Sequence, residues 1–181
     1  MTEEIDEALF PRGVPSKRRE IASTFELYRM MVESSERLVD RRQGVNTFFL
    51  TTNGAILAAV GFMLGGTIDA QLQTAGLMAL TVAGLILALA WRSLLVSFGQ
   101  LNTGKFEVIN ELEKLLPAAI YSAEWIALGE GKDPKKYRSF TAREVWVPTV
   151  FFVIYCVSAI ALLLNLLSVV DLSMLAEWLA K

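Results

Sequence analysis

The sequence predicts an all-α integral membrane protein with three transmembrane helices, whose long cytoplasmic amphipathic helices form a helical bundle in a homo-oligomer. Hydrophobic residues make up 54% of the 181 residues and charged residues only 20%. Residues 44–68, 70–91 and 145–170 contain no Asp, Glu, Lys or Arg, and each is long enough to cross a bilayer. Apolar stripes at helical spacing continue outside these stretches and require burial. Together these observations exclude an ordinary water-soluble globular domain.

Charge and hydropathy divide the chain into successive segments. Pro11 and Pro15 interrupt any helix at the start, so we expect a mobile arm there. The predicted segments are a cytoplasmic arm (1–19), a cytoplasmic amphipathic helix (20–43), transmembrane helix 1 (44–68), a short outer loop with transmembrane helix 2 (69–91), a cytoplasmic helical region (92–144), transmembrane helix 3 (145–170) and an extracytoplasmic tail (171–181).

The amphipathic helix before the first span is predicted from the spacing of its apolar residues. The stripe recurs every three or four residues and runs through Ile21, Phe25, Tyr28, Val32, Ser35 and Val39. The opposite face carries Arg29, Glu33 and Arg37, whose signs alternate at i,i+4. We interpret that face as solvated.

The first two spans are predicted to form a helical hairpin, because only a few polar or small residues separate their apolar runs. Small residues four apart, such as Gly84 and Ala88, allow helix backbones to approach closely in lipid. Beyond Trp91 the apolar stripe continues through Leu94, Phe98, Leu101, Val108, Leu112 and Leu115 until Pro117 ends it. The second span should therefore continue into the cytoplasm as one long helix.

The return to the membrane combines a short helix over residues 121–128, a turn-rich link and basic residues at the lipid surface. Thr141 is a candidate cap for the third span, with Pro148 tolerated in its first turns. Trp91 and Trp146 are predicted to mark the inner membrane interface and Trp178 the outer one. The residues expected to contact lipid headgroups are Arg41, Arg42, Lys135, Lys136 and Arg143.

The basic residues predict how the chain is oriented in the membrane. Sixteen of the 17 Lys and Arg residues lie before the first span or between residues 92 and 143. Because Lys and Arg near span ends stay in the cytoplasm, we expect a cytoplasmic N-terminus and an extracytoplasmic C-terminus.

The composition removes many kinds of chemistry. The sequence has no histidine and one cysteine, Cys156, so His-dependent catalysis and thiol metal sites are excluded. We therefore expect no enzyme activity, catalytic residue, cofactor or metal. Glu107, Glu111 and Glu113 are interpreted as surface charge on the projecting helix. A net charge of −2 indicates no nucleic-acid partner.

Two asparagines within the spans have two interpretations. Asn53 and Asn165 either line a lumen between subunits or make hydrogen bonds between helices, and the second interpretation is favoured. Arg92, at the inner end of the second span, suits a lipid phosphate or a neighbouring carboxylate better than catalysis.

A long motif leads to a family resemblance. Its residues are Trp91, Arg92, Ser97, Leu101, Asn102, Lys105, Phe106, Val108, Ile109, Leu112, Glu113, Leu116, Pro117, Glu124, Trp125, Pro148 and Phe151, preceded by Tyr28, Arg41, Arg42, Gln43, Asn46, Phe48 and Phe49. The pattern resembles the RipA family of bacterial inner-membrane proteins over roughly residues 20–165. Arg92 departs from it, since many relatives have a second tryptophan there. The resemblance implies a homo-octamer in the cytoplasmic membrane with no known enzymatic activity. The family's namesake is linked to growth of an intracellular pathogen inside host cells and to envelope homeostasis.

The leading hypothesis is a non-enzymatic membrane scaffold that binds itself and membrane lipids, with a cytoplasmic protein partner left open. The alternatives are a signal-gated channel or membrane-perturbing effector of a stress or defence system, and an envelope enzyme acting on lipids. If assembly is the function, the residues expected to matter are Asn102, Lys105, Glu113, Glu124 and Trp125. Asn102 and Lys105 share a helical face and are expected to bond to Glu113 or Glu124 of the same or the next subunit.

Overall fold

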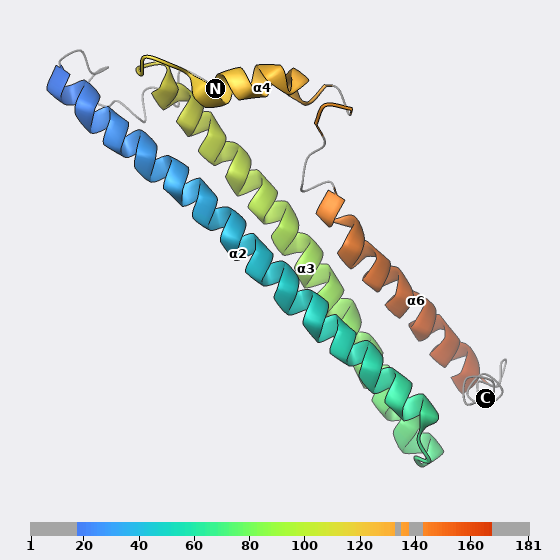
Figure 1. Cartoon of the computed structure of the whole chain (residues 1–181). Coiled ribbons are helices and arrows are strands. Elements are labelled where there is room, and N and C mark those ends of the chain that lie inside the picture. Colours follow the sequence, from blue (N-terminus) through green and yellow to red (C-terminus); the bar gives the residue numbers. More distant parts are fainter. Residues whose placement is uncertain (1–17, 133–134, 138–142, 168–181) are drawn as a thin grey trace. The chain divides into compact units, whose positions relative to one another are not determined.

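The computed structural model describes residues 18–132, 135–137 and 143–167. Regular structure in these ranges is entirely helical (Figure 1). The elements are α2 (Arg18–Gly65), α3 (Ala70–Glu113), α4 (Ile120–Ala127), the 3₁₀ turn η1 (Gly129–Gly131) and α6 (Trp146–Leu166). By length and composition α2, α3 and α6 are able to cross a membrane. The predictions for residues 1–17, for Thr141, and for the tail with Trp178 lie outside the described ranges.

The first long helix joins two segments that the sequence separates. The predicted amphipathic helix (20–43) and transmembrane helix 1 (44–68) form one 48-residue helix, α2. Gly44 lies at the junction, and a glycine inside a helix costs only about 1 kcal/mol, so it does not end the helix. No proline interrupts this stretch.

The second long helix continues past Trp91 without a break, as the apolar stripe predicts. Asp69 begins it, since its Oδ1 accepts the backbone N–H groups of Gln71 at 3.0 Å and Leu72 at 3.2 Å. The helix ends at Glu113, slightly earlier than the expected end at Pro117. The chain tightens after it, with Leu116 N–H donating to Glu113 O at 3.0 Å. Pro117 disfavours helical geometry at the residue before it.

The chain folds as two compact units, and both long helices contribute to each. The described part of unit 1 comprises residues 18–43, 96–132 and 135–137, together with Arg143, and that of unit 2 comprises residues 44–95 and 144–167. In unit 1 the α2 and α3 segments run antiparallel, because Tyr28 bonds to Glu113 while Ser35 bonds to Asn102. In unit 2 they are again antiparallel, since Asn46 bonds to Trp91 and Met63 O to Gln73.

Unit 2 has a small aromatic core and a largely apolar exterior. Phe49, Trp91 and Leu95 are buried together. Large apolar side chains remain exposed on all three helices, including Phe48, Phe62, Leu72, Val82, Ile86, Val153, Val157 and Ile160. A surface of this kind suits hydrocarbon rather than water, as expected for membrane-spanning helices.

Candidate functional site

Glu113 is the centre of the polar network in unit 1. Its side chain is only 1% exposed. Its carboxylate accepts hydrogen bonds from the backbone N–H of Tyr121 at 2.9 Å, from the N–H of Ser122 at 3.1 Å, from the Ser122 hydroxyl at 3.2 Å and from the Tyr28 hydroxyl at 3.1 Å. Through these contacts one side chain connects α2, α3 and α4.

This carboxylate also caps α4. The residue before that helix, Ala119, provides no side-chain cap, so the first N–H groups need another acceptor. Tyr121 and Ser122 lie in the first turn of α4, and the end of α3 supplies that acceptor as a negative charge, which the positive end of a helix dipole favours. Glu113 was expected to be surface charge, and that expectation is wrong because the turn between α3 and α4 covers it.

The hydrogen bonds set the ionisation of Glu113. Burial by itself raises the pKa of this carboxyl, but the donors from Tyr121, Ser122 and Tyr28 outweigh burial and hold its pKa below the usual value of 4.5. Burial and the nearby carboxylate raise the pKa of Tyr28 to about 12. At neutral pH the pair is therefore a carboxylate and a neutral phenol, which suits a stable hydrogen bond rather than proton transfer.

Asn102 and Lys105 connect α3 to α2 by other partners than expected. Asn102 Oδ1 accepts a hydrogen bond from the Ser35 hydroxyl at 3.3 Å, and Lys105 Nζ donates to the Ser34 hydroxyl at 2.6 Å. The sequence predicted bonds from these two residues to Glu113 or Glu124 of the same or the next subunit. Within one chain neither bond is present. Phe106 packs edge-on against the Tyr121 ring, with centroids 5.3 Å apart.

The remaining motif residues of unit 1 surround α4. Glu124 and Pro117 are exposed, and Trp125 is half exposed with its ring edge-on to Tyr137, 5.7 Å between centroids. The indole also lies against Gly131, whose φ is +70° and where an added Cβ would come within 3.0 Å of the ring. Glycine suits this position because its backbone adopts a positive φ and because a Cβ would lie close to the indole ring.

Unit 2 contains a second polar cluster, centred on Trp91. This side chain is 2% exposed, and its Nε1–H donates to Asn46 Oδ1 at 2.8 Å. Asn46 Nδ2 in turn donates to Glu144 at 3.2 Å. Trp91 was predicted to mark the lipid interface, but its indole is buried between Phe49 and Phe151, with centroids 5.8 Å and 6.1 Å away. Trp146 is exposed.

Asn53 makes an interhelical hydrogen bond, the favoured of its two interpretations. It is 0% exposed, and its Oδ1 accepts from the Tyr155 hydroxyl of α6 at 3.0 Å. Its Nδ2 donates to Phe49 O within α2 at 2.8 Å. The Tyr155 ring packs directly on Gly84 of α3. Asn165 is half-buried on α6, where Pro148 is buried in the first turn, as expected.

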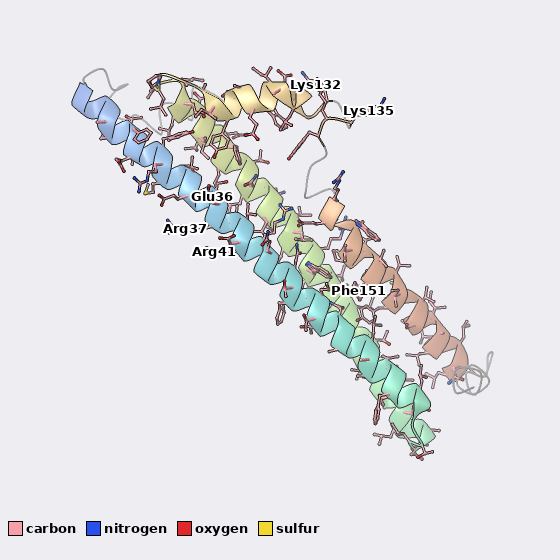
Figure 2. The ribbon with its side chains drawn as sticks, in the orientation of Figure 1. Glu36, Arg37, Arg41, Lys132, Lys135 and Phe151 are labelled. Atoms are coloured by element: carbon pink, nitrogen blue, oxygen red, sulfur yellow. The ribbon has the colours of Figure 1, made fainter. Side chains whose placement is uncertain are left out.

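The basic residues expected at lipid headgroups are mostly accessible. Arg41, Arg92, Arg143, Lys135 and Lys136 are exposed and Arg42 is half-buried. Figure 2 shows Arg41 on α2 and Lys132 and Lys135 beyond α4. Arg29 and Arg37 both pair with Glu33 at 3.1 Å and 3.2 Å, which confirms the solvated face of this helix. Glu111, by contrast, is buried while it pairs with Lys114.

Several partners in these clusters are not evident from the sequence. Tyr28 was placed in the apolar stripe and in the family motif without a hydrogen-bonding role, while Ser122, Glu144 and Tyr155 were not singled out. The local sequence does not show whether a tyrosine or serine hydroxyl forms a hydrogen bond within the fold or is exposed to solvent, because its partner is distant along the chain. Asn110 Oδ1 was missed too. It is buried and has no hydrogen-bond partner among the described residues.

A hollow lies beside the polar cluster around Trp91. This hollow has a volume of about 210 Å³ and is lined by Asn46, Thr47, Leu50, Trp91, Glu144 and Val147. It is smaller than the clefts of roughly 300–1,000 Å³ that bind small molecules. Nor does the described part hold a group of three or more His, Cys, Asp or Glu arranged to bind a metal ion.

The comparisons with known proteins give one positive result. The profile of the octameric membrane protein family, 8xMP, matches residues 25–164. This range includes both polar clusters and the whole motif. No curated protein and no solved structure matches the chain.

Proposed function

Because this chain belongs to the octameric membrane protein family, we propose that it acts as a non-enzymatic, homo-octameric scaffold of the bacterial inner membrane, in envelope homeostasis or stress adaptation. The observation that carries this proposal is the family match across most of the chain. The resemblance to the RipA family supports the bacterial inner membrane and the envelope role.

The use of the polar side chains supports a scaffold. The carboxylate oxygens of Glu113 accept hydrogen bonds from α2 and α4. The side-chain amide of Asn53 both donates and accepts a hydrogen bond. A catalytic carboxylate instead needs access to substrate and a pKa near the working pH. The lowered pKa and burial of Glu113 are the opposite of both requirements.

The charge distribution supports the orientation. Arg29, Arg41, Lys105, Lys132 and Arg143 belong to unit 1, and such Lys and Arg residues flanking spans stay on the cytoplasmic side. Unit 1 is then the cytoplasmic part of the scaffold, where partners or neighbouring copies bind. The lipids of the inner leaflet contact its basic residues.

The mass of the particle tests the proposal. The full chain is reconstituted in nanodiscs, its mass is measured by native mass spectrometry, and the particle is imaged for a central opening. Eight copies with a closed centre are expected. A monomer or dimer would overturn the octamer.

Dye release separates the scaffold from the channel. Liposomes loaded with a small fluorescent dye and containing the octamer are expected to retain it as well as protein-free liposomes do. Release by octameric protein would replace the scaffold with the channel hypothesis, while the octamer itself would stand.

A further inference from the structure

We propose that the octamer is a cyclic ring in which one apolar face of unit 1 packs against a different apolar face of the next copy. This inference rests on the octameric state proposed above. It goes further by naming the two surfaces that meet. One surface is formed by α2 and α3 and the other by α2 alone, and both lie outside the uncharged stretches of the chain.

The first surface, face A, surrounds the Lys105–Ser34 hydrogen bond. Met30 precedes Ser34 by one helical turn, and Leu101 precedes Lys105 by one turn, so each lies beside its bonded neighbour. Leu27 extends the face by one further turn. These three apolar side chains are 50% to 58% exposed.

The second surface, face B, is a stripe on α2. Phe25, Val32 and Val39 recur every seven residues, the spacing by which helices pack in coiled coils. Phe25 and Val39 are 49% and 47% exposed. The sequence placed these residues in one stripe with Tyr28 and Ser35, but in the structure Tyr28 and Ser35 bond to α3, while Phe25 and Val39 stay about half exposed.

The two faces lie on opposite sides of the α2–α3 pair. Thr24 and Leu38 are buried, and Phe25 and Val39 each follow one of them, a rotation of about 100° around the helix. Leu27 and Ser34 instead precede Tyr28 and Ser35, which rotates them the other way. Face A and face B therefore flank the buried line of α2 on either side.

Membrane insertion requires two such faces. Copies of one chain share one orientation in the bilayer, so a two-fold axis in the membrane plane, which would invert half of them, is excluded. Eight equivalent copies then surround a single axis along the membrane normal, and every contact in such a ring joins two different surfaces. A single self-complementary patch cannot close it.

The charges beside the two faces are complementary. Arg41 lies two turns after Ser34 on the face A side, and Glu36 lies one turn after Val32 on the face B side. Both are exposed, and Figure 2 labels them along the same part of α2. Opposite charges at the edges of an apolar contact fix its register and discourage like-to-like pairing.

Cysteine crosslinking tests this arrangement in the full chain. Cys156 is first replaced by serine, and then Leu101→Cys on face A and Val39→Cys on face B are introduced singly and together. Each variant is treated in membranes with a short bismaleimide. The double variant is expected to give a ladder of products up to eight copies, because each copy links to both neighbours. Each single variant should stay monomeric.

Asp40 provides the control position for this crosslinking experiment. Asp40→Cys is exposed and adjacent to Val39 but turned toward the charged side, so its combination with Leu101→Cys should give no ladder. A dimer from either single variant, or no ladder from the double variant in a particle of octameric mass, would overturn the proposed faces. A particle of fewer than eight copies in the unsubstituted protein would count against the octameric function instead.

Discussion

Glu113 stands at the end of α3 and binds the first turn of α4, which follows the turn at Leu116 and Pro117. Pro117 directs the chain out of α3, and the carboxylate left at the helix end binds the first turn of α4. A buried carboxylate with several donors is stable only when all of them are present, since each lost bond leaves a desolvated group. Its role is therefore sensitive to small chemical changes.

Glu113→Gln is expected to destabilise the protein by about 2 kcal/mol, because an amide lacks the charge and places an NH₂ group against N–H donors. The measurement is thermal unfolding of the detergent-solubilised protein followed by tryptophan fluorescence. Glu124→Gln makes the same change at an exposed position of α4 and should stay within about 0.5 kcal/mol of the parent. Equal stability of the two variants would contradict the capping role.

The stability that Glu113 contributes is expected to decrease on acidification. Because the pKa of Glu113 is lowered on folding from 4.5, its stabilising contribution is complete above that pH and is lost as the pH falls through the lower folded value. The gap in melting temperature between the parent and Glu113→Gln should therefore narrow as the pH falls below 4.5. A gap that widens on acidification would contradict the assignment.

At the scale of helices, Gly84 determines how closely α3 and α6 approach. A Cβ at this position would lie 2.2 Å from Cζ of Tyr155 and 2.3 Å from Cε1. The ring cannot move away freely, because its hydroxyl is bonded to Asn53. The glycines of the spans thus differ, since an added Cβ would meet a neighbouring ring at Gly84 and nothing within 4 Å at Gly61.

Gly84→Ala is expected to cost about 1–3 kcal/mol through overpacking. Gly61→Ala is the matched control, since nothing lies within 4 Å of its added Cβ, and alanine there should be neutral or slightly stabilising in a helix. Heating each purified variant and measuring the fraction that remains monodisperse by size-exclusion chromatography compares them. If the monodisperse fraction after heating is the same for Gly84→Ala and Gly61→Ala, α3 and α6 can move apart without loss of stability.

At the scale of the whole molecule, the distribution of basic residues is expected to fix the orientation of the chain in the membrane. In the Cys156→Ser background, Asp69→Cys should react with a membrane-impermeant maleimide in intact cells. Lys132→Cys should react only after the membrane is opened. Both positions are exposed, so accessibility alone does not separate them, and the reverse pattern would invert the predicted topology.

The sequence by itself determined the helical class, the three candidate spans and the long continuous α3, because hydropathy and apolar spacing are local properties of the chain. It also separated the charged side of α2, where Glu33 pairs with arginines one turn away. These features need only neighbours within one or two turns.

Only the tertiary structure decided what the polar motif residues do. From the sequence, Glu113 was predicted to be surface charge and Trp91 to mark the membrane interface. Both side chains are buried, because their partners come from segments far away in the chain. Likewise the apolar stripe of α2 divides into residues that face α3 and residues left exposed, since one helix covers only part of another's circumference. Burial and hydrogen bonding depend on which helices meet, and that information is not carried by any local pattern.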